Sequence, residues 1–214
     1  MKTRDRIIQA SLQLFNENGE RSTTTNHIAA HLGMSPGNLY YHFRNKEDII
    51  RSIFTLYETH LESAFQPYDQ QQLNVELLIS YFDAIFYTMW QFRFMYGNLV
   101  DILGRDELLK QRYLKVQVRV QAHATKLLTQ LCHDGFLSID ADKIAKLADT
   151  IRMIVSFWIS YQLTQSDSTG ITKAALYEGV LRVLMIFRGY ATASSTETFI
   201  RLEHHYAGLA KKPL

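Results

Sequence analysis

Residues 24–50 read TTNHIAAHLGMSPGNLYYHFRNKEDII, and this stretch carries the clearest structural signals in the chain. Thr23 or Thr24 can cap a short helix that ends at Gly33, since glycine readily takes the left-handed backbone conformation found after helix ends. Only two residues separate that glycine from Pro36, which suits the first position of a helix because its missing N–H group has no partner to lose there. The sequence therefore predicts two short helices joined by a tight turn.

Two short helices joined in this way form a helix-turn-helix, in which the second helix enters the major groove of DNA and the first braces it. Here the second helix begins with small residues, Gly37 and Asn38 behind the capping Ser35, and these allow a close approach to base edges. An ordinary pair of packed helices is the alternative, and it would leave Tyr40 and Tyr41 half-buried. Spacing alone does not separate the two interpretations.

Helices are also predicted on both sides of this unit. Upstream, residues 3–18 place apolar side chains at helical spacing, with Thr3 as a cap and Gly19 as a stop. Downstream, a long helix over 46–64 has an inward apolar stripe and would join the unit to the rest of the chain. We therefore expect residues 1–50 to form a helix-turn-helix DNA-binding domain. Its predicted core includes Ile28, Leu39 and Phe43.

The same residues resemble the DNA-binding signature of the TetR family of bacterial transcriptional regulators. The resemblance covers about the first 50 residues without a gap, and Met34 stands where the family usually has valine or alanine. The matching positions are Thr24, Thr25, Ile28, Ala29, Gly33, Ser35, Gly37, Leu39, Tyr40, His42, Phe43, Lys46 and Glu47. Beyond this region the chain matches the family only in length, helical content and layout.

The resemblance implies roles in DNA binding for several positions. It implies that Pro36, Gly37 and Asn38 lie against bases, and the Asn38 amide can pair with adenine through two hydrogen bonds. It also implies that the phosphate backbone is held by Thr25, Tyr40, Tyr41, His42 and Lys46. Lys46 has a further rationale, because it begins the following helix, where free N–H groups attract anions.

The composition is that of a folded helical protein. Of 214 residues, 47% are hydrophobic and 21% charged, while 10 glycines and 3 prolines are too few for a loop-rich β-protein. The formal charge is +2, and all of the excess lies in residues 1–51, which hold seven Lys and Arg against five Asp and Glu. This bias favours a polyanionic partner for the N-terminal part. The single cysteine, Cys132, excludes an internal disulfide and fits a reducing cytosol.

Residues 51–214 are predicted to form a second helical domain that binds an effector and a partner subunit. Helices are expected over 73–96, 97–104, 106–133, 141–166, 171–190 and 195–208. Glycines and polar clusters separate them, and a loop is expected around Pro67 and the polar run 69–72. The whole chain is therefore predicted to be all-α.

Aromatic residues gather in two of these segments and suggest a ligand site. A cavity lined by rings and a few polar groups binds apolar small molecules, whereas a close-packed core is the alternative interpretation. The resemblance implies an effector cavity in this part of the chain, and the expected effector is a hydrophobic or amphipathic small molecule. The candidate ligand contacts are Phe86, Trp90, Phe94, Phe157, Trp158, Tyr161, Arg119 and His123.

The two long helices near the C-terminus are apolar on more than one side, which predicts a surface for a second copy of the chain. Two such helices from each subunit can pair as a four-helix bundle, and a second subunit supplies the second reading head that a palindromic DNA site requires. Burial of both helices within one subunit is the alternative. The candidate interface residues are Ile151, Val155, Leu176, Gly179, Val180, Val183 and Phe187.

Other classes of function lack support in the sequence. No uncharged apolar run is long enough to span a membrane, and the N-terminus lacks the pattern of a signal peptide, so we expect a cytoplasmic protein. Catalytic, phosphate-loop and dinucleotide motifs are missing, which argues against an enzyme, and neither a cofactor nor a metal is expected. A helical adaptor that binds a protein partner without DNA is the remaining alternative. We expect a ligand-responsive homodimeric regulator of the TetR type, and specifically a repressor that binds operator DNA.

Overall fold

The part of the chain that the structure describes is helical. The computed structural model describes residues 2–64, 75–165 and 170–211, and these contain no β-strand beyond one isolated bridge between Leu137 and Ala191. The first four helices are α1 (Thr3–Asn18), α2 (Thr25–His31), α3 (Pro36–His42) and α4 (Lys46–Ala64). They are followed by α5 (Val75–Gln91), α6 (Arg93–Gly97), α7 (Leu99–Arg105), α8 (Glu107–His133), α9 (Ala141–Thr164), α10 (Lys173–Gly189) and α11 (Thr196–Ala210). The predicted all-α fold is confirmed.

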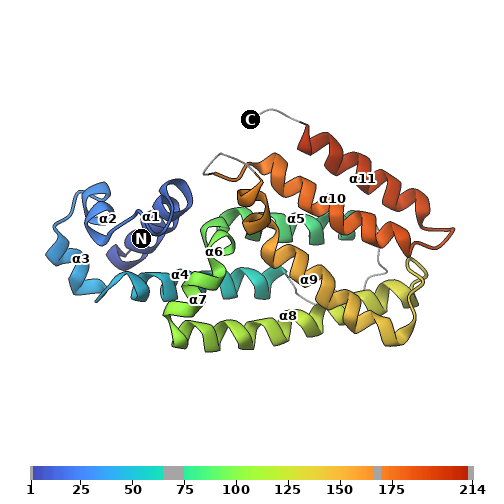
Figure 1. The fold of residues 1–214 in the computed structure, drawn as a ribbon, viewed down its shortest axis with the longest axis horizontal. Helices are drawn as coiled ribbons and strands as arrows, with labels where there is room; N and C mark the ends of the chain where they lie inside the picture. Colours follow the sequence, from blue (N-terminus) through green and yellow to red (C-terminus); the bar gives the residue numbers. More distant parts are fainter. Residues whose placement is uncertain (1, 65–74, 166–169, 212–214) are drawn as a thin grey trace.

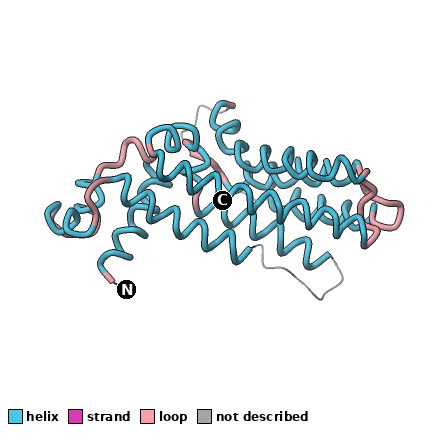
Figure 2. The backbone as a smooth tube through the Cα atoms, turned by 90° about the horizontal axis from the view of Figure 1, so that it is seen from below, coloured by secondary structure: helices cyan, strands magenta, loops and turns pink. Residues whose placement is uncertain are grey.

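The helices form two lobes joined by α4. Figure 1 shows α1, α2 and α3 together at one end of the molecule, with α3 outermost, and α5 to α11 as a larger bundle at the other end. Helix α4 runs from the small lobe along the bundle, and Figure 2 shows the same elongated arrangement from below. The predicted domain boundary at residue 50 falls inside α4, so one helix serves both lobes.

The helix ends of the helix-turn-helix form as the sequence predicts. Thr24 caps α2 by accepting a hydrogen bond from the His27 N–H at 3.2 Å, and the His27 ring accepts one in return from the Thr24 N–H. Ser35 caps α3 by accepting from the Asn38 N–H, also at 3.2 Å. Gly33 has a φ of +63° in the turn between these helices, a conformation that favours glycine. Local residue choices therefore set both helix starts and the turn.

The helix predicted over 73–96 is interrupted, which is the largest difference from the sequence prediction. Helix α5 ends at Gln91 and α6 begins at Arg93. The side chain of Asn16 in α1 binds backbone groups on both sides of the break: its amide donates to the Gln91 carbonyl at 2.8 Å, and its oxygen accepts from the Phe94 N–H at 3.1 Å. Asn16 lies 75 positions from Gln91, so spacing within the segment does not reveal this contact.

The other helix boundaries differ from the predicted ones by a few residues. Lys2 rather than Thr3 takes the cap position of α1, and Gly97 closes α6 instead of beginning α7. The expected loop around Pro67 and 69–72 lies outside the described residues. Helices α8, α9, α10 and α11 form in the expected segments, with ends that differ from the predicted ones by no more than about two residues.

Buried side chains form two clusters, and the first one unites the two lobes. It contains Phe15 and Leu39 from the small lobe, Phe54 from α4 and Phe94 from α6. The ring centroids of Phe15 and Phe94 lie 5.2 Å apart, so the small lobe packs directly onto the segment after the helix break. The second cluster lies among α5, α8, α9, α10 and α11 and includes the fully buried Tyr206. Because packed interiors deform little, the small lobe and α6 are mechanically connected.

Helices α9 and α10 approach closely at Gly179. A Cβ atom at this position would lie 2.7 Å from the indole ring of Trp158. The indole N–H donates to the Ala175 carbonyl at 2.7 Å, which holds the ring over the glycine. The absence of a side chain at Gly179 is therefore a packing requirement of this helix pair.

We expect Gly179→Ala to destabilise the fold by about 1–3 kcal/mol, because overpacking displaces the buried Trp158 ring. Gly104→Ala is the matched control, since Gly104 also lies in a helix and an added Cβ there meets no atom within 4 Å. The control should be neutral or stabilising by up to about 1 kcal/mol, because alanine favours a helix more than glycine does. Urea denaturation measures both variants, and equal stabilities would contradict the close contact.

Candidate functional site

Helix α3 buries one side and exposes the other. Leu39 is fully buried beneath it, whereas Tyr41 is 84% exposed and Tyr40 is 48% exposed. The first turn is exposed as well and consists of Pro36, Gly37 and Asn38. A helix packed inside a bundle would cover these groups, so the structure favours the helix-turn-helix over the alternative of an ordinary helix pair.

The residues predicted to contact the phosphate backbone of DNA lie near this exposed side of α3, with one exception. The hydroxyl groups of Thr25 and Tyr40 lie 2.9 Å apart, which links the start of α2 to α3. His42, at the end of α3, packs edge-on against Tyr41 with ring centroids 5.1 Å apart. Arg44 is exposed in the following turn and adds a cation that the family motif does not single out. The feature of the sequence that could have pointed to Arg44 is its position just after the end of α3.

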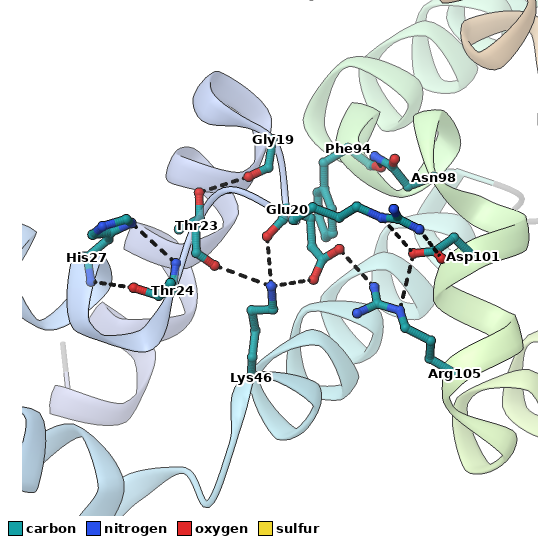
Figure 3. Close-up of polar contacts among 11 residues, drawn as sticks. Gly19, Glu20, Thr23, Thr24, His27, Lys46, Phe94, Asn98, Asp101 and Arg105 are labelled. Atoms are coloured by element: carbon teal, nitrogen blue, oxygen red, sulfur yellow. Dashed lines mark hydrogen bonds and ion pairs between the residues drawn. The ribbon is translucent and has the colours of Figure 1, made fainter.

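Lys46 is the exception, because its ammonium group points inward. It forms an ion pair with the Glu20 carboxylate at 2.8 Å and donates to the carbonyl oxygens of Glu20 and Thr23 at 2.9 and 3.3 Å (Figure 3). An ammonium group has three N–H donors; two of them bind the carbonyl oxygens, while the contact with the carboxylate is an ion pair without hydrogen-bond geometry. In this structure Lys46 holds the turn after α1 onto the start of α4, and its phosphate contact stays a prediction.

Glu20 is the centre of a charge cluster that joins the small lobe to α7. Its side chain is fully buried, and while Lys46 pairs with one carboxylate oxygen, Arg105 of α7 binds the other at 2.8 Å (Figure 3). Asp101, one turn earlier in α7, pairs with Arg105 at 3.2 Å and with Arg21 at 2.5 Å. The hydrogen bond from Arg21 holds the pKa of the Asp101 carboxyl below its usual value. Since a buried carboxylate must be paired, the cluster fixes the small lobe against α7.

Further ion pairs tie α4 to α8. Arg51 binds Asp106, the N-terminal cap of α8, at 2.6 Å, and Arg112 of α8 pairs with Glu58 farther along α4. Asp106 is only 7% exposed, so its pair with Arg51 is shielded from water and salt. The small lobe is therefore connected to the bundle by charged contacts through both α4 and α7.

A partly enclosed cavity of about 110 Å³ lies inside the bundle, among residues from both buried clusters. Helices α4, α5, α6, α8, α9 and α10 contribute to its wall, which is mainly aliphatic and aromatic. The hydroxyl groups of Tyr57 on α4 and Tyr96 on α6 lie 3.3 Å apart at this wall. Burial raises the pKa of both phenols, so they remain neutral hydrogen-bonding groups. The cavity is thus suited to an apolar ligand.

The predicted ligand contacts do not line this cavity. Phe86 stacks on Tyr177 of α10 at 4.1 Å, and Phe94 packs on Phe15 in the cluster between the lobes. Trp90 lies beneath the guanidinium group of Arg93, 4.3 Å from it. The spacing of these aromatics is helical, but their side of α5 and α6 meets α1 and α10. The two polar candidates also lie elsewhere: the Arg119 side chain is 51% exposed and pairs with Glu62 at 3.5 Å, and His123 is exposed.

The aromatic cluster of α9 lies at the outer surface, whereas the predicted dimer residues lie inside the subunit. Phe157 and Tyr161 are 44% and 53% exposed, and with Trp158, Met153 and Met185 they line an open groove on the outer face of α9 and α10. Four predicted dimer residues face inward and line the cavity, namely Ile151, Val155, Val183 and Phe187. Three more are buried within the subunit, namely Leu176, Gly179 and Val180. Both helices are apolar on two sides, and periodicity does not distinguish the cavity side from the outer side.

This fold and its exposed α3 define a helix-turn-helix transcriptional regulator. The family model described as "Bacterial regulatory proteins, tetR family" matches residues 7–53, and that described as "Bacterial transcriptional repressor" matches residues 56–199. The chain belongs to the TetR family, so it is a DNA-binding regulator and not an enzyme. No helix in the described ranges is both long and apolar enough to cross a membrane. Those ranges also hold no group of three His, Cys, Asp or Glu side chains placed to bind a metal.

Individual relatives agree with this assignment. A TetR-family transcriptional regulator from Marinobacter aquaeolei VT8 matches with a TM-score of 0.87 and 34% identity, over 96% of this chain and 99% of that structure. The HTH-type transcriptional regulator SrpR of Pseudomonas putida is 25% identical, and the match spans 66% of each chain. QacR of Staphylococcus aureus is 39% identical over 59 residues, which are 28% of this chain and 31% of that relative. The chain therefore spans about two thirds or less of the length of these two relatives.

We expect Lys46→Met to destabilise the fold by about 2–3 kcal/mol, because the buried Glu20 carboxylate would keep only Arg105 as a charged partner. Arg21→Met is the control, since Arg21 belongs to the same cluster but its side chain is 70% exposed. Exposed pairs contribute little, so the control should melt close to the wild-type temperature. Thermal unfolding followed by circular dichroism measures both. A Lys46 variant as stable as the control would contradict the importance of the buried pair.

Proposed function

We propose that the chain is a repressor that binds a palindromic operator as a homodimer and leaves it when an apolar or amphipathic small molecule enters the cavity. The observation that carries this proposal is the exposed helix α3 at the outer end of the small lobe, with its first turn and both tyrosines accessible. A helix exposed in this way can enter the major groove, and α2 can brace it across the DNA backbone.

The exposed residues of α3 suit two kinds of DNA contact. Pro36 and Gly37 carry little bulk, so the first turn can approach base edges, where the Asn38 amide is able to pair with adenine. Hydroxyl and ring groups next to them suit phosphate oxygens, and these belong to Thr25, Tyr40, Tyr41 and His42. Arg44 adds a cation beside them, whereas Lys46 acts indirectly by holding the start of α4 in place.

The outer groove of α9 and α10 suits a second copy of the chain. Met153 and Met185 are 56% and 58% exposed there, beside Phe157 and Tyr161, and a cluster of exposed large apolar side chains usually marks an interaction surface. Pairing of this face about a two-fold axis would form a four-helix bundle. It would also provide two α3 helices, which a palindromic site with half-sites about 34–36 Å apart requires.

The cavity is positioned to influence the DNA-binding lobe. Its wall includes Tyr57 of α4, the helix that carries the small lobe, and Tyr96 of α6, whose first turn is held by Asn16 of α1. A ligand that pushes these tyrosines apart would shift α4 or α6 and change the spacing of the two α3 helices. By linkage, the ligand must then bind more weakly to the DNA-bound form.

Tyr41→Ala should weaken binding to operator DNA by about tenfold, because it removes a hydrogen-bonding ring from the exposed side of α3 without opening the core. Tyr87→Ala is the control: this tyrosine is 51% exposed but lies on α5. Fluorescence anisotropy with DNA from around the protein's own gene, at two salt concentrations, measures both variants. Sequence-selective binding that survives the higher salt supports the proposal. Salt-sensitive binding to every sequence alike, or equal affinities of the two variants, would contradict it.

Phe157→Asp should convert the dimer to a monomer, because it places a charge in the middle of the apolar outer groove. Val118→Asp is the control, since Val118 is 71% exposed on α8, outside that groove. Sedimentation velocity of the two variants and the wild type measures the assembly state. A Phe157 variant that sediments as the wild-type dimer would assign the interface to another face.

A further inference from the structure

One strip of the cavity wall combines a charged side chain with neutral polar ones. Arg152 is the one charged residue among the described residues that line it, and Gln117 and Ser156 lie beside it on the facing sides of α8 and α9. Arg152 and Ser156 are one helical turn apart and so share a face of α9. The other hydroxyls at the wall include that of Thr88, which donates to the Ala84 carbonyl at 2.8 Å. The charge at the cavity is therefore concentrated at the seam between α8 and α9.

The guanidinium group of Arg152 is held at this seam, but not all of its N–H donors are used there. It donates to Gln117 at 3.1 Å and to Gln121 at 3.2 Å, and it pairs with Asp149. A guanidinium group has five N–H donors, so these three bonds leave two for another acceptor. The Arg152 side chain is 30% exposed and that of Asp149 is 59% exposed, which places the pair between the cavity and water.

We propose that the effector is an amphipathic anion, with an apolar body in the cavity and a carboxylate or similar head on Arg152. This inference rests on the proposed function of the cavity as the effector site. An anionic head deep in the apolar part would lose its hydration without gaining a partner, so it must remain at the α8–α9 seam. The planar guanidinium group matches the two oxygens of a carboxylate. The exposed Asp149 can return to water at little cost when such a head displaces it.

The volume of the cavity limits the apolar body. An apolar cavity of about 150 Å³ holds a benzene molecule, so about 110 Å³ suits a body of about four carbon atoms without rearrangement. A longer body requires part of the wall to move, and that wall includes Tyr57 of α4 and Tyr96 of α6. The length of the effector therefore determines how far the helices that carry the small lobe are displaced.

Calorimetry with the full chain tests the class of ligand, with octanoate, methyl octanoate and 1-octanol as probes. We expect octanoate to bind about tenfold tighter than its methyl ester or the alcohol, because only the acid offers an anionic head. Arg152→Gln should weaken octanoate binding about tenfold and leave binding of the ester unchanged. Arg152→Lys should retain part of the preference, because it keeps the charge. Arg201→Gln is the matched control, since that arginine side chain is 68% exposed on α11, outside the cavity.

Three results would overturn the anionic class: equal binding of the acid and the ester, the same effect of Arg152→Gln on both, or no binding of any probe. If Arg152→Gln does not fold, the preference for the acid over the ester is compared between the wild type and Arg152→Lys. That comparison then decides whether the site selects an anionic head. Anisotropy with operator DNA separates this inference from the function on which it rests. Octanoate bound through Arg152 without any release of DNA would contradict effector release while supporting the anion site. Operator binding without a preference for the acid would overturn the anion site alone.

Discussion

The buried carboxylate of Glu20 is the contact on which the arrangement of the two lobes depends. Its oxygens are held by Lys46 from the start of α4 and by Arg105 from the end of α7, and water does not reach its side chain. An unpaired carboxylate in that position would be costly, so the turn after α1 and the two helices must stay together. The orientation of α3 relative to the bundle follows from this constraint, because only a short turn connects α3 to α4.

Two of the helices that contact the small lobe, α4 and α6, also reach the cavity. Helix α4 carries Lys46 at its start and Tyr57 at the cavity wall, and α6 carries Tyr96 at that wall next to the break bound by Asn16. Packed helices have few alternative arrangements, so a change at the wall must be absorbed by a shift of a whole helix. If a ligand occupies the cavity as proposed, this shared use of α4 and α6 is the physical basis for its coupling to α3.

Helix α9 serves two surfaces at once. Its inner side places Ile151, Val155 and Arg152 at the cavity, while Phe157 and Tyr161 on its outer side line the open groove. A ligand that displaces α9 would therefore also act on whatever covers that groove. Such an arrangement needs a helix that is apolar on two sides, which explains why this segment lacks the single apolar stripe of an ordinary surface helix.

Local features were predictable from the amino-acid sequence because they depend on residues within one helical turn. The caps Thr24 and Ser35, the positive φ of Gly33 and the outward face of α3 opposite Leu39 are of this kind. The family motif in residues 24–50 was equally local, so the class of protein was accessible before the fold.

Tertiary packing decided the rest. Lys46 turns inward because Glu20, 26 positions earlier, is buried beside it, and the break after Gln91 forms because Asn16 binds its backbone groups. Periodicity likewise identified the apolar sides of α9 and α10 but not which side faces the cavity. A hydrophobic pattern indicates that one face of a helix is buried. Which segment buries that face depends on contacts between residues far apart in the chain.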